Sequence, residues 1–282
     1  MHVLITGASG FVGHWATQAL RTAGHALTRV ARGAEGDGAV RVDLAEPGAI
    51  TALLRARAPD AVLHLAAVPD IAPCKADPAA ARALNADCAA ELARACARGP
   101  RLVHVSTDQV FDGSRGAWTE ADTPRPLHVY GETKRAGERA VLELCPDAAV
   151  LRPGLITGDA PGGRRSCSSG LRAALERASA GGERPGLFTD EIRSPIAVAD
   201  LARALVTVLE RRELTGLFHA GGPEALTRHE LALREAAAWG FPASLMRAST
   251  RAEAGLEHER PADLSLDSSR LVRALGWTPA AR

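Results

Sequence analysis

Short apolar runs alternate along the chain with longer amphipathic stretches rich in Ala, Leu and Arg. The apolar runs are typical of buried strands, and the stretches between them repeat apolar residues at helical spacing. In order, the segments are HVLIT, FVGHWATQALRTAG, HALTRVAR, AEPGAITALLRARAP, AVLHLAA, PAAARALNADCAAELARACARG, RLVHVST, YGETKRAGERAVLEL and AAVLRPGLITG. This alternation predicts an α/β fold built on a doubly wound parallel sheet.

The pattern becomes irregular after Gly158, where Gly- and Ser-rich breaks surround a single helical stretch, LRAALERA. A helix followed by a strand returns at about residues 191–222. We therefore expect residues 1–158, completed by about 191–222, to form the sheet domain. Residues 159–190 and 223–282 are expected to form a smaller, largely C-terminal lobe.

The composition removes several classes of partner. Lys and Arg total 34 against 33 Asp and Glu, so no basic field is present to hold a nucleic acid or an anionic membrane surface. The five cysteines are far apart, without the spacing of a zinc site or a disulfide scaffold, and we assign no metal. With no signal peptide and no apolar run of membrane-spanning length, a cytoplasmic protein is expected.

A glycine-rich turn follows the first strand directly. Gly7, Gly10 and Gly13 give the spacing GxxGxxG where a helix begins, which suits the tight turn, the close backbone approach and the helix–strand packing of a Rossmann-type dinucleotide site. The expected cofactor contacts here are Gly7, Ser9, Gly10, Phe11, Val12 and Gly13. The second strand ends in Arg32 where NAD-binding folds carry an acid, so we expect NADP(H) to be preferred, with NAD(H) possible.

The predicted helix YGETK carries the candidate catalytic pair. Tyr130 and Lys134 are four residues apart and so share one helix face. Tyr130 is the only tyrosine and Lys134 is one of two lysines in the chain. A nearby ammonium is expected to lower the pKa of the phenol, so that Tyr130 exchanges a proton with a substrate oxygen. Thr107, at the end of the strand RLVHVST, would hydrogen-bond that oxygen.

These residues together resemble the extended short-chain dehydrogenase/reductase superfamily, which carries GxxGxxG, a Ser/Thr and YxxxK. Over essentially the whole chain there is a closer likeness to dTDP-4-dehydrorhamnose reductases and their sugar-nucleotide-binding (RmlD-like) relatives. It is carried, in order, by STDQVFDG, YGETKRAGE, LRPGLITG, DEIRSPIAVADLA, GLFHAGG and RPADLSLDSSRLVRALGWTP. The resemblance implies NAD(P)H-dependent reduction of a nucleotide-activated keto-deoxysugar, a substrate-binding role for the smaller lobe, and a possible homodimer.

The resemblance also implies roles for individual residues. Lys134 would hold the nicotinamide ribose in addition to acting on Tyr130. Further cofactor contacts would come from Asp43, Leu44, Leu65, Ala66, Ala67 and Asn85. Substrate contacts would come from Asp108, Gln109, Val110, Phe111 and Arg193.

Departures from the family pattern keep other functions open. Sugar-nucleotide dehydratases carry Asp-Glu after the Thr, whereas this chain has Asp108 and Gln109, and an amide cannot act as the base for water elimination. Reduction is therefore favoured over dehydration. A sugar-nucleotide epimerase that retains its cofactor and a non-catalytic sugar-nucleotide- or NADP-binding regulatory subunit remain the alternatives.

Overall fold

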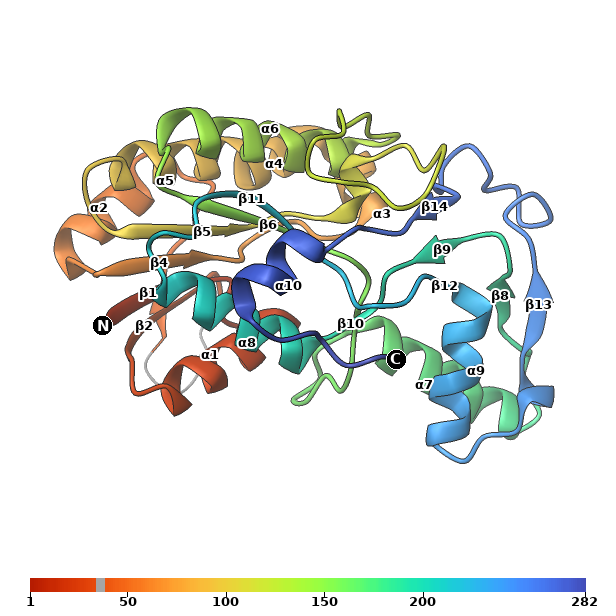
Figure 1. The fold of residues 1–282 in the computed structure, drawn as a ribbon. Coiled ribbons are helices and arrows are strands. Elements are labelled where there is room, and N and C mark those ends of the chain that lie inside the picture. The colour runs from red at the N-terminus through yellow and green to blue at the C-terminus, as the bar shows by residue number, and fades with distance from the viewer. Residues whose placement is uncertain (34–38) are drawn as a thin grey trace.

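The computed structural model describes residues 1–33 and 39–282 of the chain. A seven-stranded sheet lies at its centre, with the strand order β3-β2-β1-β4-β5-β6-β11 and every pairing parallel (Figure 1). The strands are β1 (His2–Thr6), β2 (Ala26–Ala31), β3 (Val40–Arg41), β4 (Ala61–His64), β5 (Arg101–Val105), β6 (Ala149–Pro153) and β11 (Gly216–Ala220). The order reverses between β1 and β4, where a doubly wound sheet opens a crevice at its carboxyl edge. The predicted fold class is confirmed.

Helices cover both faces of the sheet. Residues alternate along β1, so Val3 and Ile5 pack on one layer and Leu4 on the other. The first layer consists of α1 (Phe11–Thr22), α8 (Val198–Glu210) and α10 (Ser269–Leu275). The second consists of α2 (Ala49–Arg57), α5 (Cys88–Cys96) and α6 (Val129–Leu144). The short helices α3 (Ile71–Ala76) and α4 (Pro78–Arg82) lead through a π-helical turn, Ala83–Asp87, into α5.

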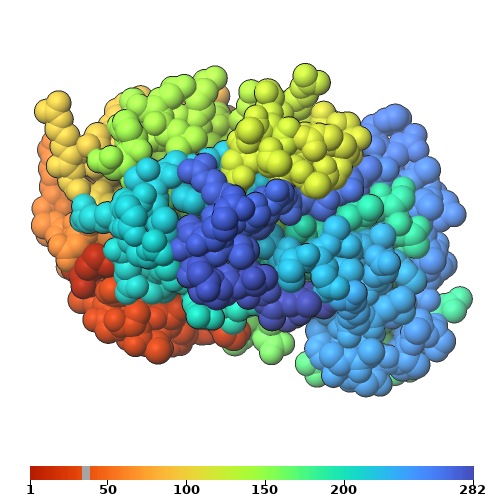
Figure 2. Space-filling model, in the orientation of Figure 1, coloured from red at the N-terminus to blue at the C-terminus, as the bar shows by residue number. Residues whose placement is uncertain are grey.

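The C-terminal helix differs from the expected division of the chain. We expected residues 223–282 to lie in the smaller lobe, but Leu271 and Leu275 of α10 are buried in the same core as Leu205 of α8 and Phe218 of β11. Helix α10 therefore belongs to the sheet domain. Figure 2 shows this segment, in dark blue, crossing the middle of the visible face between α8 and α9.

The smaller lobe is assembled from segments far apart in the sequence. Its helices α7 (Cys167–Ser179) and α9 (Arg228–Ala238) pack through Leu175 and Ala232. Its strands form short pairs and one triple: β10 (Ile196–Ala197) with β7 (Ile156–Thr157), β13 (Arg247–Ser249) with β8 (Gly186–Phe188), and β12 (Leu226–Thr227) and β14 (Asp263–Leu264) on either side of β9 (Ile192–Arg193). Two 3-10 turns, Asp108–Val110 and Ala243–Leu245, complete the described structure.

Across residues 1–33 and 39–282, no helix is both long and apolar enough to cross a bilayer. All five cysteines are free thiols, and Cys74, Cys88, Cys96 and Cys145 are buried.

Candidate active site

The glycine-rich turn is built so that side chains are excluded from it. Gly7 has a φ of +68°, and a Cβ added there would lie 2.7 Å from the backbone nitrogen of Ala66. A Cβ on Gly13 would lie 2.1 Å from the carbonyl oxygen of Gly7. Gly10 caps α1 without a side chain, and the first turn of the helix carries no acidic residue. The unpaired N–H groups of a helix start attract phosphate, so this turn fits a dinucleotide pyrophosphate.

The backbone at Leu65 and Ala66, which lies beside the glycine-rich turn, is held in place by the hydroxyl of Thr6. Thr6 Oγ1 accepts hydrogen bonds from the backbone N–H groups of Leu65 and Ala66, both at 3.2 Å. Its own proton is then available for Nδ1 of His64, 2.7 Å away. Burial, followed by the charge of Lys134, lowers the pKa of His64 to about 3, so this ring is neutral and able to accept. The pair fixes Leu65 and Ala66 beside Gly7, and Ala67 follows them at the same edge.

Asn85 lies on the π-helical turn and is fully buried. Its Oδ1 accepts from the backbone N–H of Val68 at 2.8 Å, and its Nδ2 donates to Thr133 Oγ1 at 3.0 Å. Asn85 thus joins the chain after β4 to α6, the helix that carries Tyr130. π-Helical turns of this kind recur at functional sites.

The remaining predicted cofactor residues lie at the far end of the crevice. Arg32 is exposed immediately after β2, and Asp43 is exposed after β3, with its Oδ1 accepting from the N–H of Ala45 at 3.0 Å. Leu44 is 8% exposed and packs in the core between the sheet and α2. Of the three, Arg32 and Asp43 are accessible to a ligand.

The predicted catalytic residues come together at the carboxyl edge of β5. Thr107 Oγ1 donates to Asp108 Oδ1 at 3.2 Å and accepts from the N–H of Gln109 at 3.2 Å. The same hydroxyl acts on the pKa of Tyr130, the second residue of α6, and lowers it in part. Lys134 Nζ, one turn further along α6, donates to the carbonyl of Val105 at 2.7 Å.

One electrostatic expectation was wrong. We expected Lys134 to lower the pKa of Tyr130, but burial raises that pKa well above its usual value, the Thr107 hydrogen bond lowers it only in part, and the charge of Asp108 raises it further. Burial also lowers the pKa of Lys134, to about 8, although Glu138 opposes the shift. Tyr130 therefore holds its proton firmly at neutral pH, which suits an acid.

Gln109 and His128 position the tyrosine. The Nδ1 atom of His128 accepts from the N–H of Gly131 at 3.1 Å, which caps α6, and its Nε2 lies 3.1 Å from Gln109 Oε1. The proton must then be on Nε2, so His128 donates to Gln109. Its ring stacks on Tyr130 with 6.1 Å between centroids. A Cβ on Gly131 would lie 2.3 Å from the carbonyl oxygen of Gln109, so the helix start fits closely on this segment.

A buried ionic cluster connects the catalytic segment to the lobe. Arg193, 3% exposed, has its Nε 4.0 Å from Asp108 Oδ2 and its Nη2 3.1 Å from Glu191 Oε1. Arg260 binds the Glu191 carboxylate through Nε at 2.5 Å and Nη2 at 2.8 Å, and Arg228 Nε is 3.9 Å away. Burial raises the pKa of Asp108 to about 6, although Arg193 and Thr107 lower it. Three arginines thus surround two carboxylates.

Two assignments to substrate need correction. Val110 and Phe111 are both fully buried, and they pack in a closed cluster with Trp118, Leu264 and Leu266. The Phe111 ring stacks on Trp118 at 4.4 Å. Because neither side chain has surface to offer a ligand, the structure supports a packing role for these two residues behind the site and not a side-chain contact with substrate.

The sequence interpretation missed His128, Glu191 and Arg260. A signal existed for His128, because it precedes the YGETK helix at its N-cap position. Glu191 and Arg260 are 69 residues apart, and no local pattern brings them together.

Among the described residues no group of three or more His, Cys, Asp or Glu side chains forms a metal site.

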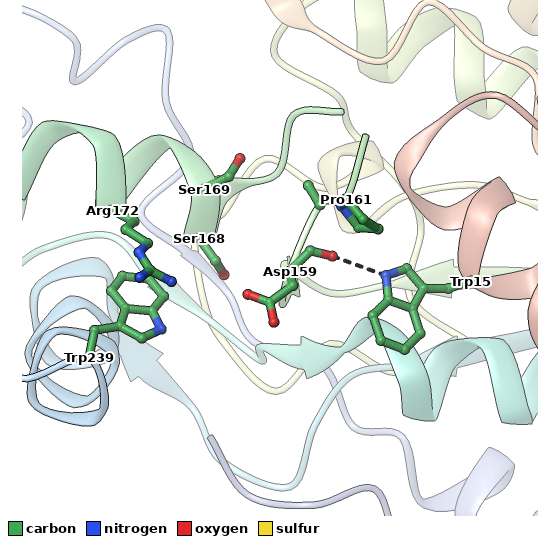
Figure 3. Close-up of a pocket in the computed structure, with 8 residues that line it drawn as sticks. Trp15, Asp159, Pro161, Ser168, Ser169, Arg172 and Trp239 are labelled. Atoms are coloured by element: carbon green, nitrogen blue, oxygen red, sulfur yellow. Dashed lines mark hydrogen bonds between the residues drawn. The ribbon is translucent and has the colours of Figure 1, made fainter. Parts of the chain in front are cut away.

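A pocket of about 440 Å³ lies between the first turns of α1 and the lobe helices α7 and α9 (Figure 3). Trp15 and Trp239 stand at its two ends, and Arg172 lies 5.8 Å over the Trp239 ring. Its other lining residues are Asp159, Ala160, Pro161, Ser168 and Ser169. None of the predicted site residues lines this pocket.

The parallel sheet, the glycine turn and the Thr107–Tyr130–Lys134 group define a dinucleotide-binding protein of the extended short-chain dehydrogenase/reductase type. The chain belongs to the RmlD substrate binding domain family, which it matches over residues 1–281. This confirms the family resemblance seen in the sequence.

Named relatives fall into two groups. The chain is 34% identical to the dTDP-4-dehydrorhamnose reductase of Mycobacterium tuberculosis, over 80% of this chain and 71% of the relative. It is 30% identical to methionine adenosyltransferase 2 subunit beta of Danio rerio, over 95% of this chain and 83% of that protein. Among solved structures, a hypothetical dTDP-4-dehydrorhamnose reductase from Sulfolobus tokodaii is 30% identical with a TM-score of 0.84, covering 97% of this chain and 94% of the other.

Proposed function

We propose that this protein reduces the keto group of a nucleotide-activated keto-deoxysugar with NAD(P)H, with NADP(H) preferred. The observation that carries the proposal is the position of Thr107 at the carboxyl edge of β5, where its hydroxyl acts on Tyr130 and where the glycine turn also lies. The relative from M. tuberculosis, named as a dTDP-4-dehydrorhamnose reductase, supports it. Exposed Arg32 supports the preference for a 2′-phosphate.

A dinucleotide held at the glycine turn of Gly7, Gly10 and Gly13 would supply the hydride for the ketone carbon. Tyr130 gives its proton to the ketone oxygen as negative charge develops there, and its raised pKa keeps that proton available at neutral pH. Thr107 hydrogen-bonds the same oxygen and fixes its position. Lys134 is held against the Val105 carbonyl, one turn along α6 from Tyr130.

The ionic cluster in the lobe suits the nucleotide part of the substrate. Arg193, Arg228 and Arg260 carry three positive charges against the carboxylates of Glu191 and Asp108. Nη1 of Arg193 and Nη1 of Arg228 are buried and make no hydrogen bond within the described structure. Arg228 and Arg260 have side-chain exposures of 22% and 33%, so they are the arginines of this cluster that a sugar diphosphate could reach. We assign a substrate contact to Gln109, and a supporting position behind it to Arg193 and Asp108, which are 3% and 4% exposed.

A second candidate is a regulatory binding subunit. It is favoured by the relatives named methionine adenosyltransferase 2 subunit beta, which are similar over most of this chain. The described structure keeps Tyr130, Lys134 and Thr107 together, which favours the reductase.

The test mixes the protein with NADPH, or separately NADH, and enzymatically prepared dTDP-4-dehydrorhamnose, and follows the loss of nicotinamide absorbance. A Tyr130→Phe variant is the control. Oxidation of the coenzyme that disappears in the variant supports the reductase and identifies its cofactor. Binding of coenzyme without consumption contradicts it and favours the binding subunit, whereas sugar conversion without added coenzyme indicates an epimerase.

A further inference from the structure

The segment between β7 and α7 lies against the first turn of α1. Arg164 Nε donates to the carbonyl oxygen of Ser9 at 2.8 Å, and Arg164 Nη1 donates to that of Pro161 at 3.0 Å. Near the other end of the segment, Trp15 Nε1 donates to the carbonyl of Asp159 at 3.0 Å (Figure 3). Two contacts from opposite ends therefore attach the segment to the glycine turn and to α1.

The base of this segment is closed by hydrogen bonds. Ser166 Oγ donates to the carbonyl of Gly158 at 2.8 Å, and the N–H of Gly158 donates to Ser168 Oγ at 2.9 Å. Ser166 also forms a reciprocal capping box with Ser169 at the start of α7. Ser168 in turn donates to Glu235 of α9 at 2.6 Å. These hydrogen bonds fix the segment that carries Arg164 to the start of α7 and, through Ser168, to α9.

The position of Arg164 places a positive charge at the cofactor crevice. Ser9 lies between Gly7 and Gly10, within the turn whose geometry fits a pyrophosphate. The first turn of α1 has no acidic side chain and no side-chain cap that would compete with a phosphate at the helix start. We propose that Arg164 binds the pyrophosphate of the dinucleotide, so that the phosphates are held by the α1 N-terminus on one side and by the lobe on the other.

Arginine is suited to this contact because its planar guanidinium matches two phosphate oxygens, and it is always charged. The proposal depends on the dinucleotide cofactor of the proposed function, and it is independent of which sugar is reduced. Arg165, the next residue, is exposed and provides a control of equal charge on the same segment.

The experiment measures the dissociation constant of NADPH for the full-length protein by calorimetry. We expect Arg164→Ala to raise it about 10-fold or more, the effect of removing a charge-assisted hydrogen bond. Arg164→Lys keeps the positive charge but not the planar guanidinium that matches two phosphate oxygens. Its dissociation constant for NADPH should therefore be intermediate. Arg165→Ala should leave it within about 2-fold, since the charge of an exposed side chain is screened by salt.

Two further ligands locate the contact. ADP-ribose contains the pyrophosphate, and Arg164→Ala should weaken its binding as much as that of NADPH. Adenosine 2′-monophosphate lacks the pyrophosphate, and its binding should be the same in the wild type and in Arg164→Ala. Because Arg164→Ala also loses its hydrogen bonds to Ser9 and Pro161, thermal unfolding without ligand is measured in parallel, and unchanged binding of adenosine 2′-monophosphate separates a binding effect from a folding effect.

Three results would overturn the inference while leaving the proposed function intact. These are unchanged NADPH binding in Arg164→Ala, an equal loss in Arg165→Ala, and an equal loss of adenosine 2′-monophosphate binding. If the wild-type protein binds neither NADPH nor NADH, both the inference and the proposed reductase fail.

Discussion

Gly137 of α6 lies directly against the carbonyl oxygen of Asn85, so closely that a Cβ on Gly137 would be 2.3 Å from that oxygen. This contact fixes how near α6 approaches the π-helical turn. It sets the height of Tyr130 and Lys134 above the sheet, because both are on the same helix. Gly137 is therefore part of the active-site geometry.

Gly137→Ala should destabilise the protein and reduce turnover. A carbonyl oxygen cannot move out of the way as a flexible side chain can, so α6 must shift, and overpacking of this kind costs roughly 1–3 kcal/mol. Gly170 of α7 is the matched control, since it is also helical and has nothing within 4 Å of its Cβ position. Gly170→Ala should stabilise by about 0.5–1 kcal/mol. Urea unfolding and steady-state rates measure both; equal behaviour of the two variants would contradict the packing argument.

Removal of the His128 ring should leave the Tyr130 side chain less firmly positioned. His128→Ala loses the N-cap of α6, which costs about 1 kcal/mol, and it also loses the ring that stacks on the tyrosine. His128→Asn keeps an N-cap oxygen but has no ring. We therefore expect Asn to restore stability in denaturant unfolding without restoring kcat. Full recovery of kcat in the Asn variant would show that only the cap matters.

The same histidine predicts a dependence on pH. Burial lowers the pKa of His128, so the folded state binds its proton less readily than the unfolded state does. Its contribution to stability is present above the unfolded pKa of about 6.5 and decreases as pH falls below it. The wild type should therefore lose unfolding free energy relative to His128→Asn between pH 7.5 and pH 5.5, as denaturant unfolding at the two pH values would show.

The features that the sequence predicted are those with local signals. The glycine turn, the position of Thr107 at a strand end and the pair Tyr130–Lys134 each depend on residues within one turn or one strand end. Their grouping at one edge follows from parallel topology. The fold class followed from the alternation of strands and helices for the same reason.

What could not be predicted depends on contacts between distant segments. The sequence of α10 does not indicate whether its apolar face packs against the sheet domain or against the smaller lobe. The segment containing Val110 and Phe111 is too short for a periodicity that separates a buried face from a ligand face. The raised pKa of Tyr130 depends on its burial and on Asp108, whereas helix spacing alone showed only Lys134.

Asp108 should make the protein less stable at neutral pH than an amide would. Burial raises its pKa from 3.8 to about 6, so its favourable contribution is complete below pH 3.8 and is lost as pH rises through 6. Asp108→Asn should therefore gain stability relative to wild type between pH 4 and pH 7.5, by at most about 3 kcal/mol. Chemical denaturation at the two pH values measures the difference.

Asp112 in the same segment provides a control of opposite sign. Hydrogen bonds from Ser114 outweigh burial and lower the pKa of Asp112. Asp112→Asn should thus be less stable than wild type above pH 3.8, and this difference should disappear as pH falls below 3.8. If both substitutions respond to pH in the same direction, the change reflects overall charge and not the burial of Asp108.

The buried pair of Glu138 and Arg152 behind the active site gives a further test. Arg152 binds both carboxylate oxygens, through Nε at 2.8 Å and Nη2 at 2.7 Å, and both side chains are at most 4% exposed. Glu138→Gln leaves a buried guanidinium without its counter-charge, which costs about 3–5 kcal/mol. Arg139 and Glu143 form an exposed pair on the same helix, so Glu143→Gln should cost less than about 0.5 kcal/mol.

A double substitution then separates the charge from the packing. Replacing both partners with apolar residues, Glu138→Leu with Arg152→Met, removes the unpaired charge and should recover much of the stability lost in Glu138→Gln. Unfolding free energies from guanidinium titrations decide this. A double variant as unstable as the single one would mean that the pair is needed for the hydrogen-bond geometry around His219, which lies 3.4 Å from Arg152 Nη1, and not only for charge balance.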